Sequence, residues 1–97
     1  MREGDLGAAG GALPDGRPYR LESWWWDGHT LVTLFFSVRG LEEASPAQLL
    51  ALVMPVLALA RVPASHRALD ADDVRVITDA AGHRMHSLTF CVRVPAL

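Results

Sequence analysis

Four histidines and one cysteine are the side chains of this sequence best suited to acid–base, nucleophilic or metal chemistry near neutral pH. His83 and His86 stand three residues apart in a segment that is typical of a strand. Residues at that spacing point to opposite faces, so this pair cannot easily share one metal ion. His83 also adjoins a predicted turn, where a solvated or turn-capping role is expected. We therefore assign no metal ligand.

His86 and Cys91 each have a structural and a chemical interpretation. His86 falls on the apolar face of its strand, where we expect an imidazole with one hydrogen-bonded nitrogen at the edge of the core. A pH-sensitive or catalytic group is the alternative. Cys91 is expected to be a small, half-buried hydrophobe, because nothing in the sequence places a histidine beside its thiol. The sequence leaves open whether His29, His86 or Cys91 has a chemical role, and we assign no catalytic residue.

Acidic and glycine-rich motifs give no further site. Asp70, Asp72 and Asp73 lie close together, but the glycine and the distal glutamate that a calcium loop needs are missing. The sequence also contains no glycine-rich phosphate loop, nucleophile elbow, zinc-ligand quartet or paired-carboxylate signature. No cofactor is implied. Small enzymes can assemble sites without motifs, so the question of an enzyme stays open, although the sequence does not favour one.

Three consecutive tryptophans are the most unusual local feature. On a strand, Trp25 points to one face, and its two neighbours point to the other face together with a leucine and a phenylalanine of the following strand. Such an apolar patch exceeds what a soluble monomer usually exposes. Aromatic anchors of this kind dominate protein interfaces and also line ligand pockets. The candidate interface or ligand-binding residues are Trp24, Trp26, His29, Leu31 and Phe35.

The tryptophans belong to the first of two predicted β-hairpins. Residues 19–39 form two runs of aromatic and β-branched residues around Asp27-Gly28, a dipeptide that is a strong signal for a two-residue turn. With that turn, Trp26 faces His29, Trp24 faces Leu31, Leu21 faces Leu34 and Tyr19 faces Phe36. Alternation then assigns one face to the core, namely Tyr19, Leu21, Ser23, Trp25, Thr30, Val32, Leu34, Phe36 and Val38.

A helix follows the first hairpin. Ser45-Pro46-Ala47-Gln48 is a capping box with proline at the first helical position. Residues 49–60 have no polar face, so we expect this helix to be covered on more than one side. It is too short for a bilayer span, which needs about 20 residues. Pro55 predicts a kink near Ala51 or an early end of the helix.

Residues 74–94 predict a second hairpin, after a linker over residues 61–73. A three-residue loop with Gly82 in the left-handed conformation pairs Val74 with Leu88, Val76 with His86, and Thr78 with Arg84. This register places the valines on the same face as Leu88, Phe90, Val92 and Val94. The opposite face is mixed.

These elements predict one small α+β domain over residues 19–97, with the order β-β-α-β-β. Two antiparallel hairpins form a four-stranded sheet that packs on one apolar helix. The second face of that sheet would be open, and dimerisation would cover it. Residues 1–18 mix glycine, alanine, proline and acidic residues without a period, which predicts a flexible leader.

Composition limits the class of protein. The chain has 97 residues, 51% of them hydrophobic, and a formal charge of −2. Its nine basic residues are all arginines and are scattered singly, so no basic stripe is available for nucleic acid. One cysteine cannot form an internal disulfide, and no apolar signal segment is visible, so we expect a cytoplasmic protein.

The sequence thus favours a small homo-oligomeric protein–protein interaction module, most simply a homodimer, that acts through apolar faces. An adaptor, an inhibitor or an assembly component fits this description, and another protein is the second candidate partner. The alternative is a small ligand-binding protein or cofactor-free enzyme. Its aromatic-lined pocket would lie between sheet and helix or between protomers.

Overall fold

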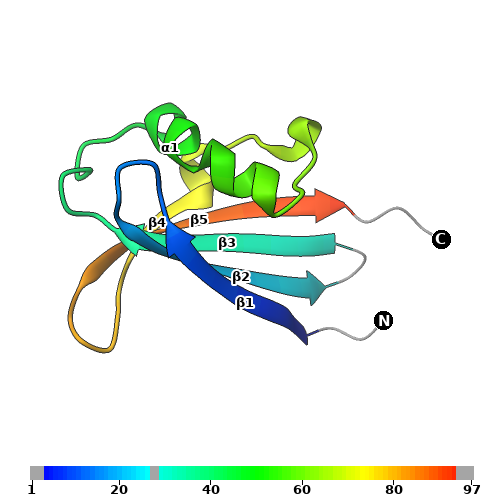
Figure 1. Ribbon diagram of the computed structural model, residues 1–97, viewed down its shortest axis with the longest axis horizontal. Coiled ribbons are helices and arrows are strands. Elements are labelled where there is room, and N and C mark those ends of the chain that lie inside the picture. Colours follow the sequence, from blue (N-terminus) through cyan, green and yellow to red (C-terminus); the bar gives the residue numbers. More distant parts are fainter. Residues whose placement is uncertain (1–3, 27–28, 94–97) are drawn as a thin grey trace.

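Five antiparallel strands form one sheet, with one α-helix packed on it, in the part of the chain that the structure describes (Figure 1). This computed structural model describes residues 4–26 and 29–93. The order in the sheet is β1-β2-β3-β5-β4. The elements in chain order are β1 (Gly4–Ala12), β2 (Pro18–Trp26), β3 (His29–Ser37), α1 (Pro46–Leu59), the short 3-10 helices η1 (Ala64–His66) and η2 (Ala71–Asp73), β4 (Val74–Thr78) and β5 (Arg84–Arg93).

The predicted register of the first hairpin is confirmed. Trp26 lies opposite His29 and Trp24 lies opposite Leu31. At the far end of the same ladder, Tyr19 lies opposite Phe36. The Asp27-Gly28 turn itself is outside the described residues. Since a slip of one residue would move every side chain to the other face, this register determines which residues enter the core.

The second hairpin also has the predicted register, with Val74 opposite Leu88 and Thr78 opposite Arg84. Its turn is a type I turn with a bulge. The Gly82 N–H donates to the Asp79 carbonyl (3.0 Å), and the Asp79 N–H donates to the His83 carbonyl (2.9 Å). Gly82 has a φ of +87°, which a residue with a side chain rarely adopts. The left-handed glycine expected from the sequence is therefore confirmed.

The sheet has five strands rather than the predicted four, because Gly4–Ala12 of the expected leader pairs along β2 as β1. Glycine and alanine favour strands weakly, so the segment gives no strand signal of its own. The pairing is anchored by Leu13, which follows β1 and is only 3% exposed in the core. Gly11 lies opposite Tyr19, and a Cβ at Gly11 would come within 2.9 Å of the tyrosine ring. The small residues of β1 thus admit the aromatic side chain of β2.

Helix α1 covers one face of the sheet and forms the core with it (Figure 1). Leu49, Val53, Val56 and Leu57 of the helix are buried. From the sheet, the fully buried side chains are those of Leu34, Phe36, Leu88 and Phe90. The sheet residues come from the face that alternation assigned to the core, and they alternate with half-buried residues along β3.

The helix begins as predicted, and it ends within one residue of the end of the predicted apolar segment over residues 49–60. The Gln48 N–H donates to the Ser45 hydroxyl, and the Gln48 side chain accepts from the Ser45 N–H, which completes the capping box. The helix continues past Pro55 to Leu59, so the early end is wrong. Its outer side is not covered: Ala51, Pro55, Ala58 and Leu59 are exposed. The expected cover on more than one side is therefore absent from the described residues.

Replacing Pro55 with alanine should stabilise the protein. Proline in a helix interior removes one N–H and is about 3 kcal/mol less favourable than alanine. Pro55 is exposed, so the substitution removes no core contact. We expect Pro55→Ala to raise the free energy of unfolding by about 1–3 kcal/mol in urea denaturation.

The matched control is Pro46→Ala, at the first position of the same helix. Proline is favourable there, so this change should be neutral or slightly destabilising. Equal stabilisation by both substitutions would contradict the distinction between the two prolines.

Candidate interaction surface

The face of the sheet opposite α1 has no covering layer among the described residues, and we call it the open face. On β2 and β3 it carries Trp24, Leu31, Thr33 and Phe35. Trp24 is 47% exposed and lies opposite Leu31, while Leu31 and Phe35 are half-buried. Three of the predicted interface residues therefore lie on one face of two neighbouring strands.

A fourth predicted residue, His29, extends this group toward the hairpin tip. His29 is half-buried and lies opposite Trp26 in the ladder. The backbone register places His29 on the open-face side of β3. The side chain of Trp26 is outside the described part of the structure.

The open face continues across β5 to β4, where it also carries the exposed Arg75, opposite Ser87. Ile77 on β4 is 39% exposed and lies opposite the half-buried Met85. In the centre of the face, the hydroxyl oxygens of Thr33 and Thr89 lie 3.4 Å apart. Cys91 is exposed rather than half-buried as expected, because it belongs to this uncovered face. The neighbouring strands β2, β3, β5 and β4 thus each contribute an apolar side chain to the surface.

Charges on the β2 part of the open face are paired with each other. The Arg20 Nε lies 2.9 Å from the Glu22 Oε1, and both side chains are exposed enough to be well solvated. These residues lie opposite Phe35 and Thr33. An exposed pair of this kind contributes little to stability. The two charges of this pair therefore offset each other on the part of the face beside Phe35 and Thr33.

Trp25 lies on the helix side of the sheet but is only half-buried. A helix of 14 residues extends about 21 Å, whereas strands of nine residues extend about 30 Å. The helix is therefore shorter than the strands it covers, and Trp25 is not among the residues of the core cluster. The end of the first hairpin presents indole surface on both faces.

In the described structure, the predicted aromatic residues do not line a pocket between the sheet and the helix. Trp24, Leu31 and Phe35 alternate with the core residues of β2 and β3, so they point away from α1. They can contribute to a ligand site only if a second molecule covers the open face.

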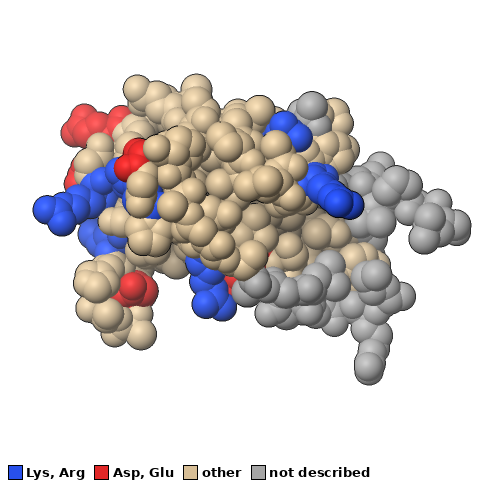
Figure 2. All heavy atoms as spheres, viewed as in Figure 1, with Lys and Arg blue, Asp and Glu red and all other residues tan. Residues whose placement is uncertain are grey.

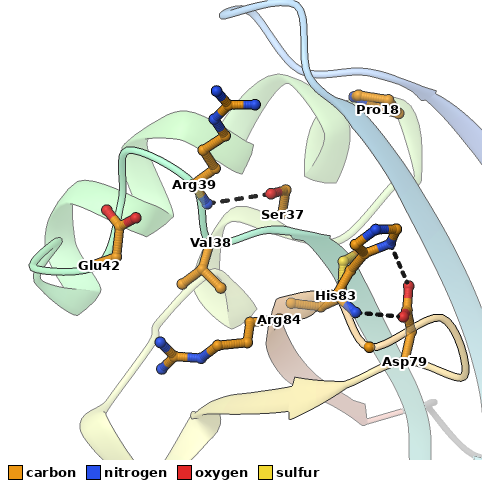
Figure 3. Close-up of a pocket in the computed structure, with 10 residues that line it drawn as sticks. Pro18, Ser37, Val38, Arg39, Glu42, Asp79, His83 and Arg84 are labelled. Atoms are coloured by element: carbon orange, nitrogen blue, oxygen red, sulfur yellow. Dashed lines mark hydrogen bonds and ion pairs between the residues drawn. The ribbon is translucent and has the colours of Figure 1, made fainter.

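A separate hollow, which the sequence did not predict, lies at the end of the sheet (Figure 3). Its volume is about 680 Å³. It is assembled from the start of β2, the end of β3 with its connector, and the turn between β4 and β5. Because these segments are far apart in the sequence, no local pattern indicates the hollow. The lining residues are Pro18, Ser37, Val38, Arg39, Glu42, Asp79, Gly82, His83, Arg84 and Met85.

The acids of this hollow are held by internal hydrogen bonds. The His83 N–H, together with the Ala81 N–H, donates to the Asp79 carboxylate, and this lowers the pKa of Asp79 from its usual value. The N–H groups of Glu42 itself and of Gly40, with Arg84 nearby, lower the pKa of Glu42. Both carboxylates are therefore ionised at neutral pH.

The charged side chains of the hollow are spread around it. In Figure 3, Arg39 lies above Val38, Arg84 lies below it and Glu42 lies to its left, whereas Asp79 lies beside His83 on the right. Figure 2 shows that charged side chains gather at this end of the molecule, whereas the surface over α1 has almost none. The hollow can meet an anionic group at its rim, but its cations do not converge on one point.

His86 is a buried residue with one bonded ring nitrogen, as expected. It is 4% exposed, and its Nε2 lies 3.0 Å from the Leu41 carbonyl oxygen. Its ring packs against Phe36, with centroids 5.6 Å apart. The Nδ1 atom has no hydrogen-bond partner in the described structure. His86 thus links β5 to the connector before α1.

Comparison with protein-family models, with curated proteins and with solved structures finds no significant match. Among the described residues, no three His, Cys, Asp or Glu side chains are grouped as metal ligands. The one α-helix in that part of the chain is too short to cross a bilayer. Function is therefore inferred from the physical character of the surfaces.

Asp79→Asn should remove a pH-dependent contribution to stability. The pKa of Asp79 is lower in the folded chain than its ordinary value, so its contribution is present above about pH 4 and is lost as the pH falls through the folded-state pKa. Urea denaturation from pH 2 to 7 should show lower stability of the variant at neutral pH and a flatter decline in acid.

Asp72→Asn is the control for this prediction, because Asp72 is exposed and lies outside the turn. It should follow the wild-type pH profile. If Asp79→Asn also kept the wild-type dependence of stability on pH, the Asp79 carboxylate would not contribute to that dependence.

Proposed function

We propose that this protein is a small homo-oligomeric interaction module that works through the open face of its sheet. The observation that carries the proposal is the position of Trp24, Leu31 and Phe35 on a sheet face that lacks a second layer among the described residues. Trp24 is 47% exposed there. Large exposed aromatic residues beside other apolar side chains mark interaction sites on soluble proteins.

The outer side of α1 supports the same proposal. Leu59 is 78% exposed, and Ala51, Pro55 and Ala58 are also exposed beside it. The domain therefore has apolar surface on both of its outer layers. A 97-residue chain has little capacity to bury more surface within itself. Association with another copy, or with another protein, is the remaining way to remove these surfaces from water.

The product of such a module is a surface rather than a reaction. An adaptor, an inhibitor or an assembly component would use the open face to hold a partner. A homodimer is the simplest form, since one patch on two copies can be self-complementary about a two-fold axis.

The ligand-binding alternative requires a pocket between two protomers. The aromatic residues face away from α1, so a pocket that includes them needs a second protomer as its other wall. Such a pocket would be lined by Trp24 and Phe35, with His29 as the nearby acid–base group. It would therefore depend on the same association of copies.

The two adjacent tryptophans provide the first test. Trp24→Arg should weaken self-association because a charge enters the apolar open face, and its stability should change little because this side chain is half exposed. Trp25→Arg should leave the open face intact but lower the free energy of unfolding by about 1–3 kcal/mol, because Trp25 is half-buried on the helix side. Sedimentation equilibrium gives the mass, and urea denaturation gives the stability.

Leu59→Arg is the matched control on the other apolar surface. If the open face is the interface, this variant should keep the wild-type mass. A monomeric wild-type protein at high micromolar concentration would contradict the homo-oligomer. Loss of association in Leu59→Arg but not in Trp24→Arg would assign the interface to α1.

A further inference from the structure

The two edges of the sheet differ in how well they are protected against pairing with another strand. Edge β1 is rich in glycine, with four among its nine residues, and its pairing is irregular between Asp5 and Gly7. Glycine and bulges both weaken a strand as a template. Edge β4 is regular, and its sequence Val-Arg-Val-Ile-Thr consists of β-branched residues except for one arginine. Such residues favour strand pairing.

The outer side of β4 presents unpaired backbone groups. The Asp79 N–H donates to the His83 carbonyl, so Asp79 directs its backbone groups toward β5. Successive residues of a strand alternate in this direction, so Thr78 and Val76 direct their N–H and C=O groups away from β5. No described strand lies on that side. The Val74 N–H, which also points outward, already donates to the Ala71 carbonyl.

Side chains at this edge leave it open rather than blocking it. Val76 is 46% exposed on the helix side, and Ile77 is 39% exposed on the open face. Proteins commonly protect an edge with charged side chains, proline or an inward-pointing charge. Arg75 is the one charged side chain of β4.

We propose that β4 pairs with β4 of a second copy, antiparallel about a two-fold axis at Ile77, so that the two sheets become one. In this register Val76 of each copy exchanges backbone hydrogen bonds with Thr78 of the other, and the engaged Val74 N–H is not required. Ile77 faces Ile77 of the second copy, and Arg75 faces the ionised Asp79 of the second copy. A register centred on Arg75 would instead place two arginines opposite each other.

A second copy suits this edge because the edge is complementary to itself in charge: in this register Arg75 of each copy faces Asp79 of the other. The pairing also joins the open faces of the two copies into one continuous face, since all strands then belong to one sheet. At the seam of that face, the two Ile77 side chains lie between the two Arg75–Asp79 pairs. The inference deepens the proposed function. It rests on that function because β4 can pair with β4 only if two copies of the chain associate.

A register-specific cross-link tests the pairing. In the Cys91→Ser background, which removes the native exposed thiol, Ile77→Cys should give a disulfide-linked dimer of twice 10.5 kDa on mild oxidation. Residues opposite each other in a pair without hydrogen bonds have Cα atoms about 4.5 Å apart, within the roughly 4.4–6.8 Å that a disulfide allows. Thr78→Cys and Arg75→Cys are the controls. Each faces a different residue of the second copy, so neither should form a disulfide-linked dimer under the same oxidation.

Absence of the Ile77→Cys cross-link, at a concentration where the uncross-linked protein is dimeric, would overturn the edge pairing. Cross-linking at Val76→Cys instead would overturn the register. Adding Trp24→Arg separates the two proposals: the Ile77→Cys cross-link should persist at high protein concentration if the edge pairs independently of the open face. An unchanged mass on Trp24→Arg alone would count against the open face without affecting the edge.

Discussion

In the part of the chain that the structure describes, the second layer of this domain is one α-helix of 14 residues, and that limit determines most of what these residues expose. A sheet can be buried on both faces only if two layers pack on it. Here the helix buries the side of the sheet that holds Leu34, Phe36, Leu88 and Phe90. The opposite side has no equivalent layer in the described residues. The core is therefore concentrated in one interface, and the open face follows directly from the number of helices.

The strand register was the part of the fold that local residues specified best. The turn signals Asp27-Gly28 and Gly82 predicted both ladders residue by residue, because short loops leave few registers compatible with the apolar alternation. The capping box likewise located the start of α1. Strand β1 could not be found in this way, because its glycines and alanines have weak intrinsic preference and pair only when β2 is already formed.

The candidate site was predictable in part for the same reason. Alternation along β2 and β3 sufficed to group Trp24, Leu31 and Phe35 on one face. Alternation did not reveal how far the helix extends over the sheet, so the half-exposure of Trp25 was not predicted. The hollow near Arg39 and His83 was missed as well, because it is formed by three separate loops whose proximity depends on the completed sheet.

The central pairing of β3 with β5 has a consequence for how the chain reaches this structure. Thr33 and Thr89, which meet there, are 56 residues apart in sequence, whereas both hairpins close locally. Contacts of high sequence separation form late and slow folding. During synthesis, strands β1–β3 emerge first, and the inner edge of β3 stays unpaired until β5 has been made. A nascent chain would thus expose the edge of an aromatic, β-branched strand for that interval, and unpaired edges of this kind are prone to aggregation.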